Sequence, residues 1–159
     1  MVEDARFEDG AEAPLRLRAL DAEDLKVISA LVQDAVFPAT EMRWQPRQRR
    51  FALLLNRFRW EDRARAEARG RSYERVQSLL VFDDVTHVAS QGIDRNDRDL
   101  VLSLLAVAFE PGDTPAGRLV LSLAGDGAIA AKAECLNVTL RDVTRPYAAP
   151  SGKAPGHPE

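Results

Sequence analysis

The pattern of apolar and polar positions predicts one helix near the N-terminus, followed by a series of β-strands. Asp21 suits a helix N-cap, and Leu20 and Leu25 stand at the positions of a hydrophobic staple. Apolar residues then recur at helical spacing until a proline ends the run. We therefore expect an amphipathic helix over 22–36, preceded by a short strand over 15–20.

The chain after this helix predicts further strands, for about seven or eight in all. The apolar run at 101–110 would suit a buried helix segment, but its length and the strand signals on both sides favour a strand. Gly125-Asp126-Gly127 predicts a hairpin turn. The strands expected after the helix lie at 41–45, 50–60, 72–82, 85–91, 101–110, 118–124 and 128–141, with turns or loops at 46–48, 61–70, 83–84, 92–99 and 111–117.

The second of these strands alternates imperfectly. Phe51 and Leu55 share one face, whereas Phe58 and Trp60 have the opposite parity. One extra residue near Asn56 restores a single apolar face, so we predict a β-bulge there. A strand covered on both faces is the alternative.

These elements predict an α+β fold with one N-terminal amphipathic helix packed on a mainly antiparallel β-sheet. The sheet is expected to be a meander that forms a sandwich or a partial barrel. A chain of 159 residues, 45% hydrophobic and 30% charged, has the composition of an ordinary globular domain. We expect residues 1–13 to be a mobile arm, 14–144 a single domain, and 145–159 a Pro/Gly-rich tail without regular structure. Whether that tail is ordered stays open.

Composition also bears on the compartment. Cys135 is the one cysteine, so no internal disulfide forms, which fits a reducing environment. No apolar run approaches the roughly 20 residues that span a bilayer, and the acidic N-terminus lacks the apolar core of a signal peptide. We expect a cytoplasmic protein without a membrane partner.

Candidate catalytic and metal-binding residues are scarce. His87, His157 and Cys135 show no partner that would make a catalytic pair or a zinc site. The acidic loop at 94–99 departs from a calcium loop, because Leu105 stands where the bidentate glutamate belongs. We predict no catalytic residue, no metal ligand and no cofactor. An enzyme with a site assembled from distant residues around His87 remains an alternative.

The segment 43–75 departs most from average composition. It holds eleven arginines against four acids, and half of the ten aromatic residues. Arginines mixed with aromatic residues on strands are typical of single-stranded nucleic-acid platforms, and the arginine fork also binds phosphate. In the alternative interpretation, the aromatic residues face the core and the arginines face water, paired with acids. The candidate anion-binding residues are Arg43, Arg57, Arg59, Arg71 and Arg75.

Several stretches resemble a family of uncharacterised alphaproteobacterial proteins. They begin at Phe51 (FALLLNRFRW), Phe109 (FEPGD), Ala124 (AGDGAI), Glu134 (ECLNVTLRDVTRPY) and Ala149 (APSGKAPGHP). The resemblance covers nearly the whole chain. It implies a small bacterial cytoplasmic protein, and it assigns no activity, cofactor or functional residue.

Three function classes follow from the sequence. The leading hypothesis is a non-enzymatic binding or accessory module with a protein partner, which exposed sheet and a Pro-rich tail would capture. Nucleic-acid or phosphate binding through 43–75 is the second, and an enzyme around His87 the third. A homodimer through an edge strand at 118–124 is a further expectation.

Overall fold

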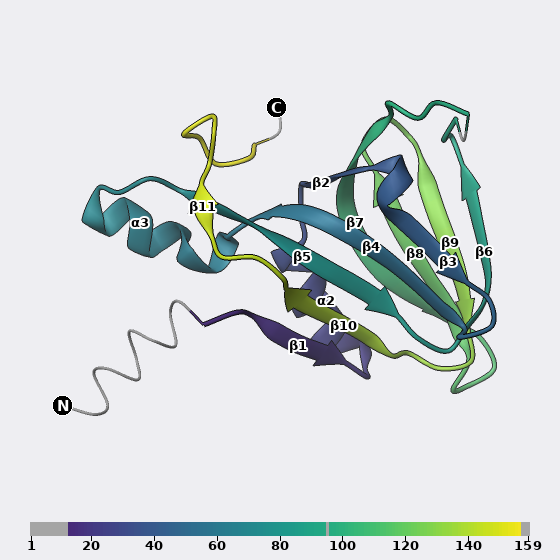
Figure 1. Ribbon diagram of the computed structural model, residues 1–159. Coiled ribbons are helices and arrows are strands. Elements are labelled where there is room, and N and C mark those ends of the chain that lie inside the picture. The colour runs from purple at the N-terminus through teal and green to yellow at the C-terminus, as the bar shows by residue number, and fades with distance from the viewer. Residues whose placement is uncertain (1–12, 95, 157–159) are drawn as a thin grey trace.

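The computed structural model describes residues 13–94 and 96–156, and these form mainly antiparallel β-strands (Figure 1). The coarse expectation of an antiparallel, sheet-rich α+β fold is confirmed. The described residues contain eleven strands rather than seven or eight. In chain order the elements are β1 (Arg16–Ala19), α2 (Ala22–Leu31), β2 (Ala35–Pro38), η1 (Ala39–Glu41), β3 (Met42–Gln45), β4 (Arg50–Phe58), η2 (Trp60–Asp62), α3 (Arg63–Arg69), β5 (Glu74–Phe82), β6 (Val85–Gln91), β7 (Val101–Pro111), β8 (Gly117–Leu123), β9 (Ala128–Ala133), β10 (Val138–Asp142) and β11 (Tyr147–Ala148).

All strands belong to one sheet with the order β1-β10-β5-β4-β2-β7-β8-β9-β6. β3 pairs with β4 and β11 with β5, beside this path. The end strands β1 and β6 do not pair with each other, so the sheet is not closed. β8 lies between β7 and β9 and has no free edge, so the edge strand predicted at 118–124 is wrong.

The start of α2 follows the sequence prediction, but its end does not. Asp21 is the N-cap, and its side chain accepts a hydrogen bond from Asp24 N at 2.8 Å. The helix stops at Leu31, and Asp34 has a left-handed φ of 62°. The following residues form β2 and pair with β7, so the prediction that the helix continues over 32–36 is wrong. The β-branched and aromatic residues there fit a buried strand, and the pairing with β7 overrides the helical spacing.

Later strand predictions are largely correct. The apolar run at 101–110 is a strand, β7, and Gly125 and Asp126 turn the β8–β9 hairpin with φ of 83° and 71°. The single strand expected at 128–141 is instead two. β9 pairs with β8 and β6, whereas β10 pairs with β1 and β5, so residues between them carry the chain across the sheet.

Two segments expected to be irregular contain regular structure. The predicted loop at 61–70 is a short helix, α3, that ends at Gly70 with a left-handed φ of 62°. Arginine and alanine are good helix formers, but this helix lacks the apolar stripe by which an amphipathic helix is predicted from sequence. In the tail, β11 pairs with β5, and Ala149 N donates to Tyr73 O at 2.8 Å. The expectation of a tail without regular structure is therefore wrong, while residues 1–12 and 157–159, with His157, lie outside the described part.

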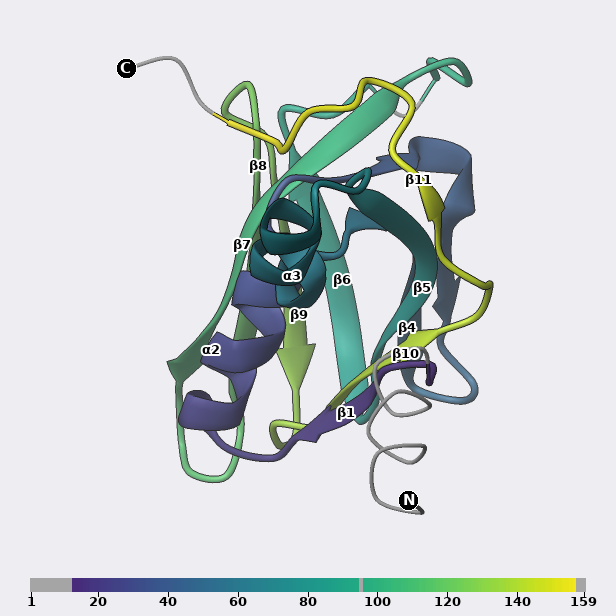
Figure 2. The ribbon, with the colours of Figure 1, turned by 90° about the vertical axis from the view of Figure 1, so that its left-hand side faces the viewer.

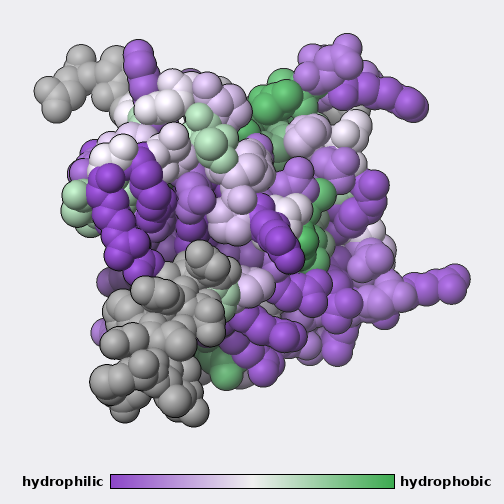
Figure 3. Space-filling view, turned by 60° about the vertical axis from the view of Figure 1, so that its left-hand side comes forward, coloured by the Kyte–Doolittle hydropathy of each residue, from purple (hydrophilic) through white to green (hydrophobic). Residues whose placement is uncertain are grey.

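The hydrophobic core is a cluster of buried side chains from the strands of the curved sheet and from α2. Leu25 and Ile28 of α2 are buried, and Ser29 Oγ accepts a hydrogen bond from Val107 N on β7 at 3.0 Å. Figure 2 shows α2 beside β7. In Figure 1, α2 lies behind β1 and β10, so the opposite face of these strands is turned toward the viewer. The surface seen in Figure 3 is mostly hydrophilic, with apolar residues in small areas only.

We predict that Gly117→Ala destabilises the fold. A Cβ at this position would clash with the ring of Phe109 and lie 2.6 Å from the backbone oxygen of Glu110. We expect the free energy of unfolding to fall by about 1–3 kcal/mol, measured by urea denaturation. Gly112→Ala is the control, because its Cβ would meet nothing closer than 3.5 Å. Equal stability of the two variants would contradict the prediction.

Candidate functional site

Arg57, one of the five predicted anion-binding arginines, is fully buried on β4. Its guanidinium donates to both oxygens of Glu61 at 2.8 Å and to both oxygens of Asp142 at 3.0 and 3.2 Å. Ser78 Oγ accepts from Arg57 Nε at 3.0 Å and donates to Asp142 Oδ1 at 2.7 Å. Burial lowers the pKa of Arg57, but the hydrogen bonds and charges of Glu61 and Asp142 outweigh it, and the pKa is raised overall. The Arg57 guanidinium is therefore engaged in hydrogen bonds with other residues of the protein.

The inward position of Arg57 explains why the bulge predicted near Asn56 is wrong. β4 pairs with β5 over eight consecutive residues without a shift. Arg57 therefore faces the same inner side of the sheet as Phe51 and Leu55. The predicted bulge assumed that this side carries only apolar side chains. Phe58, of the opposite parity, is also buried. The end of this strand is covered on both faces, as the alternative interpretation proposed.

Arg59 and Arg71 belong to a second group of charges. Arg59 is buried, donates to Glu74 and lies 3.9 Å from Asp62. Arg71 donates to the two carboxylate oxygens of Asp62 at 2.8 and 2.6 Å. The hydrogen bond from Arg71 is the largest reason why the pKa of Asp62 lies below its ordinary value. Both arginines thus form ion pairs within the protein.

Arg75 and Arg43 complete the predicted set. Arg75 donates from Nε to Asn56 Oδ1 at 2.6 Å, and burial lowers its pKa. Arg43 is exposed on β3 and donates to the backbone oxygens of Thr40 and Met42. The structure does not bring the five predicted arginines together on one open face. Anion binding by this set stays a prediction, and Arg43 alone of the five lies on the surface described next.

The aromatic residues of segment 43–75 do not line that surface either. Phe58 packs edge-on against Trp60, with ring centroids 4.7 Å apart, and against Tyr73 at 5.5 Å. Phe51 lies in the core. Trp44 lines a separate, mainly apolar hollow of about 490 Å³ between β3 and β6. These residues therefore act in packing rather than as a platform beside the arginines.

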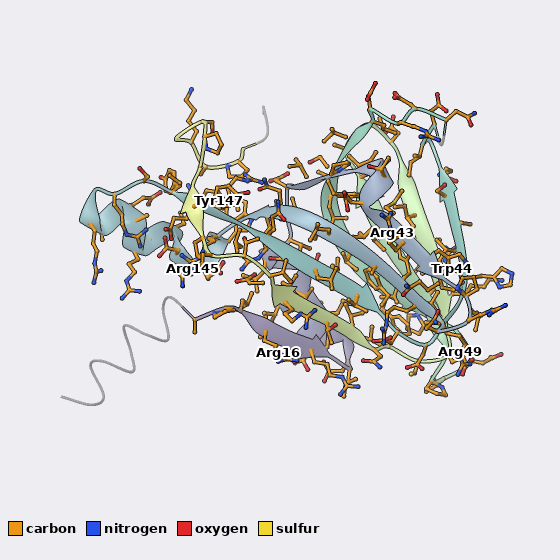
Figure 4. All side chains as sticks on the ribbon, in the orientation of Figure 1. Arg16, Arg43, Trp44, Arg49, Arg145 and Tyr147 are labelled. Carbon is orange, nitrogen blue, oxygen red and sulfur yellow. The ribbon has the colours of Figure 1, made fainter. Side chains whose placement is uncertain are left out.

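A different set of arginines gathers on the outer face of β1, β10, β5, β4 and β3. Figure 4 shows this face toward the viewer, with Arg16 on β1 and Arg43 on β3. The face is hollowed by about 670 Å³. Among the described residues that line the hollow, Asp83 is the one acid, and it accepts from Arg50 Nε at 2.9 Å. We call this surface the arginine face; its exposed arginines are Arg16, Arg18, Arg43, Arg50 and Arg141.

Strand register places the arginines at the two sides of this face. In one row across the sheet, the successive partners are Arg18, Thr139, Val81, Ala52 and Arg43. The three residues between the arginines are small or aliphatic and half-buried. These three residues therefore form the floor of the hollow, and one arginine stands at each end of the row.

In the neighbouring row, Arg16 on β1 and Arg141 on β10 are direct cross-strand partners. Leu79 and Leu54 continue the row on β5 and β4. Arg16 and Arg141 are exposed, and neither side chain forms a hydrogen bond or ion pair with any residue in the described ranges. Like charges directly opposite each other destabilise a sheet. Among the described residues, this pair is thus a concentration of positive charge without a carboxylate partner.

Arg16, Arg18 and Arg141 lie outside the segment 43–75, and Arg50 lies within it but is not one of the five candidate residues. A signal exists in the alternation Arg16-Leu17-Arg18, which assigns both arginines to one face of a strand. What the sequence does not supply is the pairing of β1 with β10, because these strands lie more than a hundred residues apart.

His87 and Cys135 gain no catalytic partner in the structure. His87 is exposed on β6, and its side chain makes no hydrogen bond or ion pair with a described residue. Cys135 Sγ donates to Asp84 Oδ2 at 3.3 Å. Burial, followed by the contact with Asp84, raises the pKa of Cys135, which disfavours the reactive thiolate.

The described residues contain no group of three or more His, Cys, Asp or Glu side chains placed to hold a metal ion. In the acidic loop, Asp94 and Asp97 instead accept backbone hydrogen bonds from Asn96 and Asp99. No described helix is long and apolar enough to cross a bilayer.

Comparison with known proteins assigns no activity. The family model described as "Protein of unknown function (DUF2948)" matches residues 15–157. The resemblance to an uncharacterised family is thereby confirmed, while an alphaproteobacterial origin stays a prediction. No curated protein and no solved structure matches the chain significantly.

We predict that Arg57→Met is strongly destabilising. It leaves the buried Asp142 carboxylate without its cation, and removing one partner of a buried pair costs about 3–5 kcal/mol. Urea denaturation measures the loss. Arg43→Met is the matched control, expected within about 0.5 kcal/mol of the natural chain. If Arg57→Met does not fold, Ser78→Ala tests the same network, with an expected loss of about 1–3 kcal/mol. Unchanged stability in Arg57→Met would contradict the network's role.

The Arg71–Asp62 pair also predicts a pH dependence. Because the folded pKa of Asp62 is lowered, its contribution is present above the unfolded pKa of about 3.9 and is lost as pH falls through the folded pKa. The stability gap between the natural chain and Asp62→Asn should therefore narrow from about pH 6 to about pH 3, measured by urea denaturation. In an Arg71→Gln background the gap should depend less on pH. A gap that stays constant in the natural background would refute this coupling.

Proposed function

We propose that this chain, which belongs to the DUF2948 family of proteins of unknown function, is a non-enzymatic module that binds an anionic partner on the arginine face. The observation that carries the proposal is the direct opposition of Arg16 and Arg141 on neighbouring strands. Neither side chain has a carboxylate partner among the described residues. A bound anion would provide that partner.

The energetics of this pair favour an external ligand. Two guanidinium groups opposite each other repel, so the free protein carries a local electrostatic cost. An anion between them replaces the repulsion with two attractions. Arginine is suited to this role because its planar fork matches carboxylate and phosphate groups with two parallel hydrogen bonds.

The other arginines of the arginine face add to the positive potential around Arg16 and Arg141. Five arginines and one acid line the hollow, whereas the whole chain has a net charge of −3. A concave surface of one sign attracts an oppositely charged partner over several ångströms and raises its association rate. Arg57, Arg59 and Arg71 add little to this attraction, since each is paired with carboxylates.

The setting is proposed as the bacterial cytoplasm, where a single cysteine stays reduced. We take the N-terminal helix to cover the core-facing side of the sheet, which leaves the arginine face for the partner. The enzyme alternative around His87 receives no support from the exposed position of that residue.

We predict that Arg16→Gln/Arg141→Gln loses anion binding without losing stability. Fluorescence anisotropy with labelled poly-L-glutamate at low salt should show affinity at least about tenfold weaker than that of the natural chain, since charge-assisted hydrogen bonds contribute about 1.5–3 kcal/mol each. The free energy of unfolding should stay equal or rise by up to about 1 kcal/mol, because the repulsion is removed. Binding by the natural chain should weaken as salt is added.

The matched control is Arg69→Gln/Arg98→Gln, which removes the same charge from exposed sites on α3 and in the loop before β7. This variant should bind poly-L-glutamate like the natural chain. No binding by the natural chain at low salt would overturn the proposed function. Equal weakening in the control would show that net charge, rather than this face, determines binding.

A further inference from the structure

We infer that the partner of the arginine face is an amphipathic protein helix with acidic residues along both flanks. This inference rests on the proposed function and names the chemistry of the ligand. It follows from the width of the face, the composition of its floor and the position of the aromatic residues.

The width of the face fits a helix. Arg18 and Arg43 stand at the two ends of one cross-strand row, four strand spacings apart. At about 4.8 Å per spacing, the two backbone positions are about 19 Å apart. An α-helix with its side chains is about 10–12 Å across. A helix running along the strands therefore fits between the arginines, which reach it from both sides.

The length of the hollow suits about two to three helical turns. It extends along β5 from Leu79 to Asp83, which is about 14 Å at 3.4 Å per residue. Nine helical residues cover the same length at 1.5 Å each. A helix of this size presents two or three acidic residues to each flank of the face.

The floor of the hollow calls for an apolar stripe on the partner. Ala52, Leu79 and Val81 point outward from the central strands, yet no described element covers them. They are half-buried by their neighbours, so the uncovered part is shallow and aliphatic. Apolar surface rimmed by charged residues is typical of protein interaction sites. A helix with apolar residues at i, i+3, i+4 and i+7 would cover this floor.

The same floor argues against single-stranded nucleic acid as the natural ligand. Nucleic-acid platforms of this kind stack bases on aromatic side chains. No aromatic side chain lines the hollow among the residues described. Of the aromatic residues in segment 43–75, Phe58 packs against Trp60 and Tyr73 instead. The charge of the face suits phosphates, but its apolar centre suits a protein.

The test uses the full-length chain and three labelled probes of equal charge density. The first is an 18-residue designed peptide with leucines at helical spacing and glutamates on both flanks. The second is the same composition in an order that abolishes the apolar stripe, and the third is oligo(dT). Anisotropy measures affinity, and circular dichroism of the peptide measures helix formation on binding.

We expect the amphipathic peptide to bind at least tenfold more tightly than the scrambled peptide and oligo(dT), and to gain helix on binding. Leu79→Gln should remove this preference while leaving the weaker binding of the scrambled peptide unchanged. If Leu79→Gln does not fold, Val81→Thr, which preserves side-chain shape, tests the same floor. Arg16→Gln/Arg141→Gln should weaken all three probes.

The other outcomes separate this inference from the proposed function. Equal binding of the two peptides would overturn the helical partner and leave anion binding intact. Tighter binding of oligo(dT) than of either peptide would also overturn it, in favour of a nucleic acid. Binding of none of the probes at low salt would overturn the proposed function itself.

Discussion

The pairing of the buried Arg57 with carboxylates is the constraint on which the rest of the structure depends. A charge taken out of water must find partners, and Arg57 finds them on β5, β10 and the turn after β4. The network fixes which residues of β4 point inward. It thereby turns Ala52 toward solvent, and the same register aligns Val81, Thr139 and the flanking arginines on the outer side.

The features predicted correctly from the sequence are those determined by neighbouring residues. Asp21 caps α2 by accepting a hydrogen bond from Asp24 N, three residues later in the chain. Gly125 and Asp126 form the hairpin turn through their own backbone conformation. The errors arise where distant residues decide. The apolar spacing predicts a helix to residue 36 because Val32 and Ala35 fit it, but α2 ends at Leu31 with Val32 as its C-cap, and Ala35 is buried in β2 after the turn at Asp34. Spacing alone does not distinguish these two ways of burying a residue.

The candidate site shows the same limit. In the sequence, Arg57 and Arg141 are equivalent: each is an arginine beside apolar strand residues. Their difference comes from partners far along the chain, since Asp142 lies 85 residues after Arg57. Six of the eleven arginines in 43–75 form ion pairs within the protein, and only Arg43 and Arg50 of this segment belong to the arginine face. The exposed set is sparse in sequence and becomes visible only when β1 and β10 lie side by side.

The late position of Asp142 also has a consequence for how the chain folds. While the protein is synthesised, β4 and β5 emerge long before β10, so Arg57 has Glu61 four residues away but gains Asp142 only when the sheet is nearly complete. Until then β1 has no neighbour and β5 has an open edge, and exposed strand edges invite pairing with other chains. Non-local pairing of this kind is slow. Nascent chains of this protein therefore pass through an interval in which the edges of these strands are open to aggregation.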